Sequence, residues 1–245
     1  MRRSHRIVGA VAASFATSVV TVTAVSSSAG AATTAKSEYQ AALKAASAQN
    51  VHYVSKATEQ GIGLKVIGDT GKTSGSAELT VKSGSTTESL AVLVVGTTGY
   101  IKGNDAALQK VLGLTATQAT TYTNHWLSFP TSNTSLAELI SGLRNADVAS
   151  ELRMTGPYTL GSTKQIGGQD AQAINGSAAT SSGTKVPIVL YVNATGTPRP
   201  IEEVTNPKAK SSSIEGTVTF SKWGEKTNPT APATSVPLVP LLPAA

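Results

Sequence analysis

Gly71-Lys72-Thr73 matches the end of a phosphate-binding loop and is the first candidate for chemistry. Such a loop needs a glycine five positions earlier, where this chain has Val66, and it joins a strand to a helix whose N-terminal amides face the phosphate. Strand-like sequence lies on both sides of "GDTGKTSG" (68–75), and Gly75 would interrupt a helix. We therefore predict a hairpin turn here.

The histidines do not suggest a nucleophilic site. A triad needs a base beside a serine and an acid that orients the base. His52 and His125 lie far apart with no nearby carboxylate, and His5 lies near the N-terminus. The G-x-S-x-G motif is missing. We expect no catalytic triad.

The acidic residues do not suggest a catalytic pair or a metal site. Glu202 and Glu203 are adjacent, and adjacent residues on a strand point to opposite faces, so they cannot flank one bond. We interpret them as a solvated strand end beside Pro200. Metal ligands cluster at characteristic spacings, whereas the aspartates are isolated and cysteine is absent. We expect no enzyme, metal or cofactor; the aspartates considered are Asp69, Asp105, Asp147 and Asp170.

The N-terminus has the features of a signal peptide. A basic start with Arg2, Arg3 and Arg6 precedes an uncharged, mostly apolar stretch, and Ala29-Gly30-Ala31 fits the cleavage rule. We expect residues 1–32 to be removed; the alternative is an uncleaved membrane anchor. The formal charge of +6 includes those three arginines, and no basic cluster with interleaved aromatics indicates nucleic acid. The protein is expected to be secreted or held at the cell envelope.

The first half of the chain predicts a helix followed by a meander. Apolar residues recur at helical spacing over 37–48. Short apolar or alternating segments bounded by glycine then predict antiparallel strands, at 51–58, 61–68, 74–84, 87–96 and 98–103.

A helical insert follows. Short helices are predicted around 106–112 and 115–123, and "NHWLSFP" (124–130) reads as a short strand or an extended link. A longer amphipathic helix is predicted over 134–152, where Thr134 or Ser135 would cap it.

Strands return after Tyr158, and the chain ends in a Pro-rich tail. Five strands are predicted, at 158–168, 169–179, 185–193, 198–206 and 213–224. Residues 229–245 lack periodicity and are expected to be flexible. Strands before and after one helical insert predict an α+β fold, with helices on one face of an antiparallel sheet.

Five segments resemble a known family. They are "VHYVSKAT", "GYIKGNDAALQKVLG", "NHWLSF", "LYVNATGTPRPIEEVT" and "TVTFSKWGEKTNPTAP", which together span roughly residues 35–232. In order and spacing they resemble the actinobacterial LppX/LprAFG-type proteins, whose fold is similar to that of the lipoprotein carrier LolA. Many relatives carry a cysteine after the signal that tethers them to the membrane. This chain has none, which puts such a tether in doubt.

The resemblance implies a fold and a function. The fold would be a strongly curved antiparallel sheet, a half-open barrel, with helices on its concave face, formed by residues 33–228. The function would be non-enzymatic binding or transport of a lipid, lipoglycan or lipopeptide in an apolar cavity between sheet and helices. The alternative is an envelope sensor or protein-interaction module with the same fold. We expect a monomer that does not bind nucleic acid, with peripheral membrane contact as a further partner.

Apolar strand and helix residues are the candidates for lining that cavity, and each could equally belong to a closed core. Trp126 and Trp223 could stand at the rim, where an amphipathic ring suits a boundary between apolar and wet surroundings; for both we favour packing. The candidate lining residues are Leu79, Val81, Leu90, Val92, Val94, Val111, Leu112, Trp126, Leu136, Leu139, Ile140, Leu143, Ile188 and Leu190.

Overall fold

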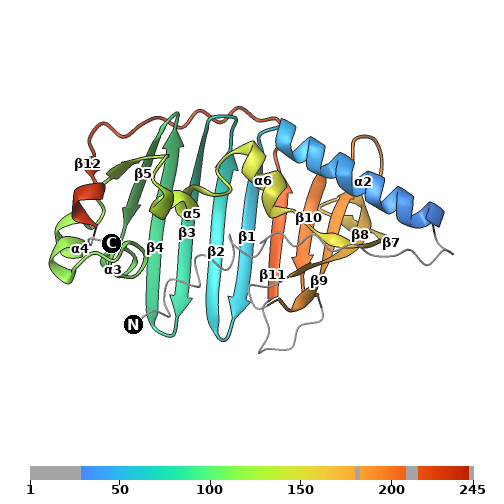
Figure 1. Ribbon diagram of the computed structural model, residues 1–245, viewed down its shortest axis with the longest axis horizontal. Coiled ribbons are helices and arrows are strands. Elements are labelled where there is room, and N and C mark those ends of the chain that lie inside the picture. The colour runs from blue at the N-terminus through green and yellow to red at the C-terminus, as the bar shows by residue number, and fades with distance from the viewer. Residues whose placement is uncertain (1–28, 180–182, 208–214, 243–245) are drawn as a thin grey trace.

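The computed structural model describes residues 29–179, 183–207 and 215–242. The expected signal segment therefore lies outside the described residues, except at its C-terminal end. The described residues form one twelve-stranded sheet in the order β12-β6-β5-β4-β3-β2-β1-β11-β10-β9-β8-β7 (Figure 1). All neighbouring strands run antiparallel except β12 and β6.

The first half is the predicted meander. Helix α2 is longer than expected, and the next five strands lie close to their predicted positions. The "GDTGKTSG" segment is confirmed as the turn of a hairpin between β2 and β3. The elements are α2 (Ala29–Ala48), β1 (His52–Glu59), β2 (Ile62–Thr70), β3 (Ser74–Ser83), β4 (Thr86–Val95) and β5 (Thr98–Gly103).

The insert begins with two well-capped helices. In α3 (Asp105–Leu112) the Asn104 side chain accepts a hydrogen bond from the Ala107 amide at 3.0 Å, and Gly113 ends the helix at φ +70°. In α4 (Ala116–Tyr122) Thr115 and Gln118 form a capping box. Both helices confirm the expectation, and β6 (Leu127–Pro130) follows as the short apolar strand.

The single long helix predicted over 134–152 is wrong. The chain forms a 3-10 turn, η1 (Thr134–Leu136), then α5 (Ala137–Ile140) and α6 (Asn145–Glu151). Gly142 separates the two helices at φ +79°, a conformation that ends a helix. Asn133 caps the first turn in place of Thr134 or Ser135, because its side chain accepts from the Ser135 amide.

The second half is a second meander joined edge to edge to the first. Strand β11 pairs with β1 over seven residue pairs, from His52–Ser221 to Thr58–Glu215. Two distant parts of the chain therefore complete one continuous sheet. The strands are β7 (Thr155–Ile166), β8 (Gln169–Ala179), β9 (Lys185–Asn193), β10 (Pro200–Thr205) and β11 (Glu215–Ser221).

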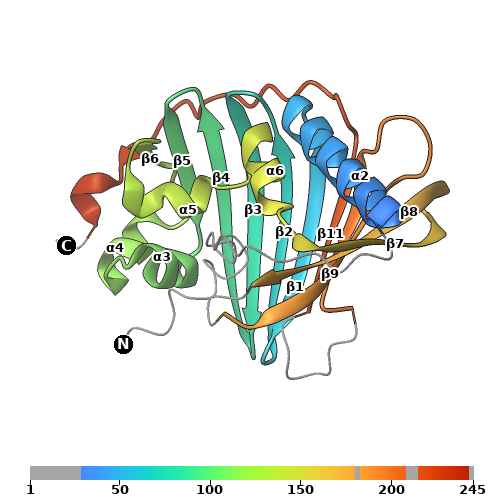
Figure 2. The same ribbon diagram turned by 45° about the vertical axis from the view of Figure 1, so that its right-hand side comes forward.

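The helices pack on the concave face in two groups (Figure 2). Cluster one joins β4, β5 and β6 to α3, α4 and α5, around residues such as Val94, Ile101 and Leu108. Cluster two joins α2 and α6 to β8, β9 and β11, around residues such as Ala42, Ile174 and Leu190. The unclosed, curved α+β sheet with helices on its concave face is thus as predicted.

A buried polar network fastens the insert to the hairpin. Thr70 is fully buried and donates a hydrogen bond to Asn145 Oδ1 at 3.0 Å, while its own Oγ1 accepts from the Val51 amide. Asn145 in turn donates to Asn50 Oδ1, and its amide donates to the Gly71 carbonyl. The turn that resembled a phosphate loop therefore holds the start of α6.

Gly75 allows the closest approach in this attachment. A Cβ at Gly75 would overlap the Leu143 carbonyl oxygen, whereas a Cβ at Gly63 meets nothing within 4 Å. We predict that Gly75→Ala lowers the free energy of unfolding by roughly 1–3 kcal/mol, because backbone must shift. Gly63→Ala is the control and should be neutral or slightly stabilising. Urea denaturation of both variants tests this; equal stabilities would contradict it.

The expectation of a flexible tail is wrong for Val236–Leu242. Residues Val236 and Pro237 form β12, which runs parallel to β6, and the Leu238 amide donates to the Ser128 carbonyl at 2.8 Å. Leu238 is fully buried within cluster one, and the 3-10 turn η2 (Val239–Leu241) follows. The tail therefore completes a core and covers the edge of β6.

Truncating Leu238 should destabilise the whole domain. We predict that Leu238→Ala lowers the free energy of unfolding by about 2–5 kcal/mol, the usual cost of emptying a buried leucine site. Val239→Ala is the control, since Val239 is 46% exposed and should change stability little. Thermal or urea unfolding measures both; a Leu238→Ala protein as stable as the control would show that the tail is not part of the core.

Candidate functional site

One row of side chains crosses the concave face of the sheet from β4 to β7. Cross-strand partners in an antiparallel sheet share a face. Leu90 and Ile174 place this row on the helix side, since they belong to clusters one and two. It is apolar except at Ser55 and Glu203; in order it contains Leu90, Leu79, Val66, Ser55, Val218, Glu203, Leu190, Ile174 and Leu160.

Apolar residues of β1, β2 and β3 form a central strip between the two clusters. The central strip consists of Ala57, Leu64, Val66 and Val81, which the register places on the concave face. Among the described residues, no member belongs to or packs against either cluster. Leu64 and Val81 are buried, while Val66 and Ala57 are half-buried. The strip is a group of apolar side chains that belongs to neither core.

Glu203 is a buried carboxyl in this apolar setting. It lies on β10 between Leu190 and Val218, and it is 6% exposed. Its Oε2 makes no hydrogen bond within the part of the chain that the structure describes. By contrast Glu88, also on the concave face and buried, is 2.5 Å from Lys110 Nζ. No described lysine, arginine or histidine forms such a pair with Glu203.

Glu151 on α6 faces the same region. Its carboxylate accepts a hydrogen bond from Ser141 Oγ at 2.8 Å. Burial raises the pKa of Glu151 to about 7, which the Ser141 hydrogen bond opposes. Burial, and then repulsion from Glu151, raise the pKa of Glu203 to about 8. Two carboxyls that resist ionisation thus share the interior between sheet and helices.

The structure divides the predicted lining residues. Most belong to cluster one or pack against it, Ile188 and Leu190 belong to cluster two, and Val81 belongs to the central strip. The cluster members pack against one another, so their role as lining residues stays a prediction. The residues in or against cluster one are Leu79, Leu90, Val92, Val94, Val111, Leu112, Leu136, Leu139, Ile140 and Leu143.

The two tryptophans differ in their surroundings, since Trp223 packs against cluster two and Trp126 belongs to neither cluster among the described residues. Trp126 has Lys102 Nζ 4.8 Å from its ring centroid, and Lys102 alternates along β5 with the inward-facing Ile101. Trp223 stacks on Phe220 and donates its Nε1 hydrogen to the Pro200 carbonyl at 3.0 Å. Trp223 therefore has a packing role, and Trp126 is not brought together with the other candidates.

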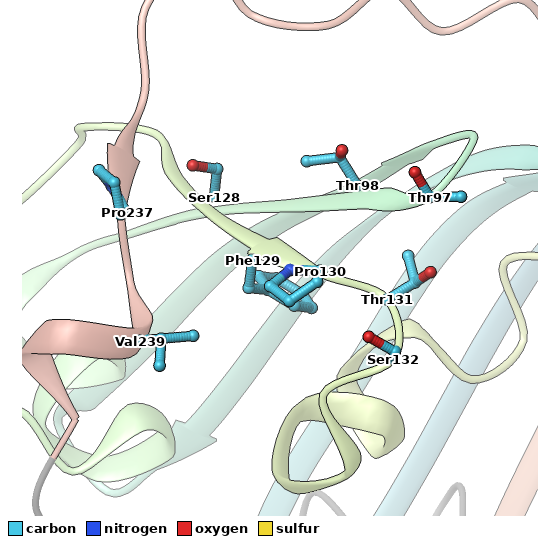
Figure 3. Close-up of a pocket in the computed structure, with 9 residues that line it drawn as sticks. All are labelled: Thr97, Thr98, Ser128, Phe129, Pro130, Thr131, Ser132, Pro237 and Val239. Atoms are coloured by element: carbon cyan, nitrogen blue, oxygen red, sulfur yellow. The ribbon is translucent and has the colours of Figure 1, made fainter.

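A surface pocket lies at the edge of the sheet, where the tail meets β6 (Figure 3). Its volume is about 580 Å³, and its side chains are hydroxyl-bearing or apolar without a charge. None of the predicted lining residues takes part in it. The lining consists of Thr97, Thr98, Ser128, Phe129, Pro130, Thr131, Ser132, Pro237 and Val239.

The expectation that His52 has no nearby carboxylate is wrong. His52 Nδ1 lies 2.8 Å from Asp69 Oδ1 across β1 and β2, and Ser221 is the partner of His52 on β11. These three residues share the convex face, since each alternates with an inward-facing neighbour. Within the described residues no hydrogen bond joins His52 to Ser221. The His–Asp contact alone does not activate a nucleophile.

The sequence reasoning missed both interior carboxyls. The interpretation of Glu202 and Glu203 as a solvated strand end is wrong for Glu203, because Glu203 is buried. The two residues do point to opposite faces, and Glu202 pairs with Lys164 at 3.0 Å on the convex face. For Glu203 alternation gave no usable signal, because a register shift between Pro200 and Glu202 interrupts it. For Glu151 the available signal was the spacing of three residues from the buried Val148 on one helix face.

Comparison with known proteins identifies the fold. No family model matches the chain, and no curated protein matches it in sequence. The crystal structure of LprF from Mycobacterium bovis matches with a TM-score of 0.54 and 15% identity, covering 82% of this chain and 98% of that chain. The lipoprotein LppX of Mycobacterium tuberculosis matches with a TM-score of 0.50 and 16% identity, covering 80% and 98%. The chain has the fold of LprF and LppX. The resemblance drawn from the sequence is thereby confirmed as a likeness of fold.

The raised pKa of Glu203 predicts how stability depends on pH. A carboxyl whose folded pKa exceeds its unfolded value binds its proton more tightly when folded, so stability falls as pH rises from about 4.5 to about 8. The slope from one such group is about 1 kcal/mol per pH unit. Glu203→Gln should remove this contribution and flatten the profile, while Glu202→Gln on the convex face should keep the wild-type slope.

Urea unfolding at intervals from pH 4.5 to pH 8 measures these slopes. Part of the wild-type slope below pH 7 should remain in Glu203→Gln, because the pKa of Glu151 is raised as well. Identical slopes for wild type and Glu203→Gln would mean that Glu203 titrates normally in the folded protein.

Proposed function

We propose that this protein is a non-enzymatic lipid-binding or lipid-carrier protein of the cell envelope. Its ligand is a lipid, lipoglycan or lipopeptide whose acyl chains lie between the concave face of the sheet and the helices. The protein acts as a secreted monomer that contacts the membrane peripherally.

The central strip is the observation that carries this proposal. Apolar side chains on the inner face of a sheet normally belong to a packed core, because burying them is the main source of stability. Here Leu64, Val66 and Val81 lie between two cores and belong to neither. An acyl chain gains roughly 0.8 kcal/mol per buried CH₂, so such a strip suits a lipid.

The fold supports the same reading. The chain shares its fold with LprF and LppX, and LppX is a lipoprotein. Ligand sites favour the concave space between layers, with apolar walls and few polar groups. The concave row has this composition, with Ser55 and Glu203 as its polar members.

The fold also suggests how a ligand would enter. Cluster one holds α3, α4 and α5 at one end of the sheet, and cluster two holds α2 and α6 at the other. Only the short link around Gly142 connects α5 to α6 on this face. In the described part of the chain, no helix combines the length and hydropathy needed to span a membrane. Acyl chains would enter between the two helical groups while the polar end stays near the rim.

Lipid occupancy tests the proposal directly. The full chain, produced in an actinobacterial host, should carry a stoichiometric adduct in native mass spectrometry that extracts into organic solvent. Val66→Trp should lower the occupancy several-fold, because the larger ring fills space on the strip. Ile67→Trp is the matched control: Ile67 is adjacent on β2 but points to the convex face, so its occupancy should equal that of wild type.

A clean mass without adduct, and no uptake of added phospholipid or diacylglycerol, would contradict the proposal. Equal loss of lipid in both tryptophan variants would contradict the placement of the ligand on the central strip.

A further inference from the structure

Glu203 is the least explained side chain of the interior. Three buried side-chain atoms lack a hydrogen-bond partner among the described residues: Glu38 Oε2, Arg199 Nε and Glu203 Oε2. Glu38 and Arg199 are only half-buried as residues, whereas Glu203 is 6% exposed. Native proteins pair nearly all such groups, and an exception calls for a physical reason.

The position of Glu203 connects it to the central strip. Glu203 and Val66 belong to the same concave row, separated by β11 and β1. Neighbouring strands lie about 4.8 Å apart, so the two positions are about 14 Å apart along the row. One extended amphiphile could therefore place its chain on the strip and its polar end at Glu203.

The surroundings of Glu203 favour one kind of polar group. Glu151 is the charged group close enough to affect the Glu203 carboxyl, and Tyr39 on α2 lies near enough to be affected by it. Neither Glu151 nor Glu203 forms an ion pair with a described lysine, arginine or histidine. A ligand carboxylate or phosphate would be repelled by the ionised form of either carboxyl, and no described cation stands beside them to offset that repulsion.

A hydrogen-bond donor suits Glu203 in either protonation state. An ionised carboxylate offers only acceptors, and a protonated carboxyl retains acceptor capacity. A hydroxyl or ammonium group can thus donate to Glu203 whether or not the carboxyl is charged. Such a bond would satisfy the oxygen that now lacks a partner.

We propose that Glu203, with Glu151 opposite it, anchors the polar end of an acyl ligand that bears a hydroxyl or ammonium donor, and that the pair excludes anionic head groups. This inference rests on the proposed lipid-binding function and adds the chemical class of the ligand. Glu203 is a binding residue in it, and Glu151 a second acceptor held by Ser141.

Displacement of a bound dye tests the anchor. Nile red, an uncharged probe of apolar sites, is bound to the delipidated full chain at pH 9, above the raised pKa values of Glu151 and Glu203, and is displaced by three ligands with the same chain length. These are monopalmitoylglycerol with hydroxyls, hexadecylamine with an ammonium, and palmitic acid with a carboxylate. Wild type should bind the first two at least about tenfold more tightly than palmitic acid.

Three variants separate the anchor from the rest of the site. Glu203→Leu should weaken the hydroxyl and ammonium ligands about tenfold and narrow the gap to palmitic acid. Glu203→Gln keeps an acceptor oxygen and should retain monopalmitoylglycerol, while its preference for the amine falls. Glu202→Gln, on the opposite face, should match wild type for all three ligands. Far-UV circular dichroism confirms that each variant is folded.

The outcomes distinguish the two proposals. If Nile red binds but Glu203→Leu ranks the ligands as wild type does, or if wild type prefers palmitic acid, the anchor is overturned and the lipid-binding function stands. If neither dye nor any ligand binds wild type, the lipid-binding function fails and the anchor fails with it.

Discussion

The rest of the structure depends on one constraint: helices must cover the apolar side chains on the concave face of the sheet. The inward-facing side chains of β4, β5, β8 and β9 are apolar, so they must be buried against other apolar side chains. The chain supplies helices at two separate places, the long α2 at the start and the short helices of the insert in the middle. It therefore builds two cores, one at each end of the sheet, and leaves the central strip between them.

Two kinds of link keep these cores in one domain. The pairing of β1 with β11 joins the two meanders through backbone hydrogen bonds. The network around Thr70 and Asn145 fixes the start of α6 against the hairpin of β2 and β3, close to the break at Gly142. Buried polar groups are costly when left unpaired, so a fully paired network fixes the geometry around it. This network therefore sets where the helical group of cluster one ends and that of cluster two begins.

Local sequence determined what could be predicted. Alternating residues between turn glycines defined both meanders, and the α+β class followed from their order. The break at Gly142 could not be read, because Leu136, Ile140 and Leu143 satisfy helical spacing whether or not the helix continues. The tail could not be placed, since β12 depends on β6, which is remote in sequence. The orientation of Glu203 was hidden by a register shift between Pro200 and Glu202, which breaks the simple alternation.

Contrast with the other carboxylates shows why Glu203 points to a ligand. Glu88 lies on the concave face and forms an ion pair with Lys110. Glu202 lies on the convex face and forms an ion pair with Lys164. The chain thus supplies a lysine for each of these two carboxylates that lie against the sheet. At Glu203 it supplies none among the described residues, and it adds a second carboxyl from α6. An isoleucine or leucine would pack at this position at no electrostatic cost. A carboxyl held in an apolar row without a partner among the described residues is best explained by a ligand that supplies the missing donor.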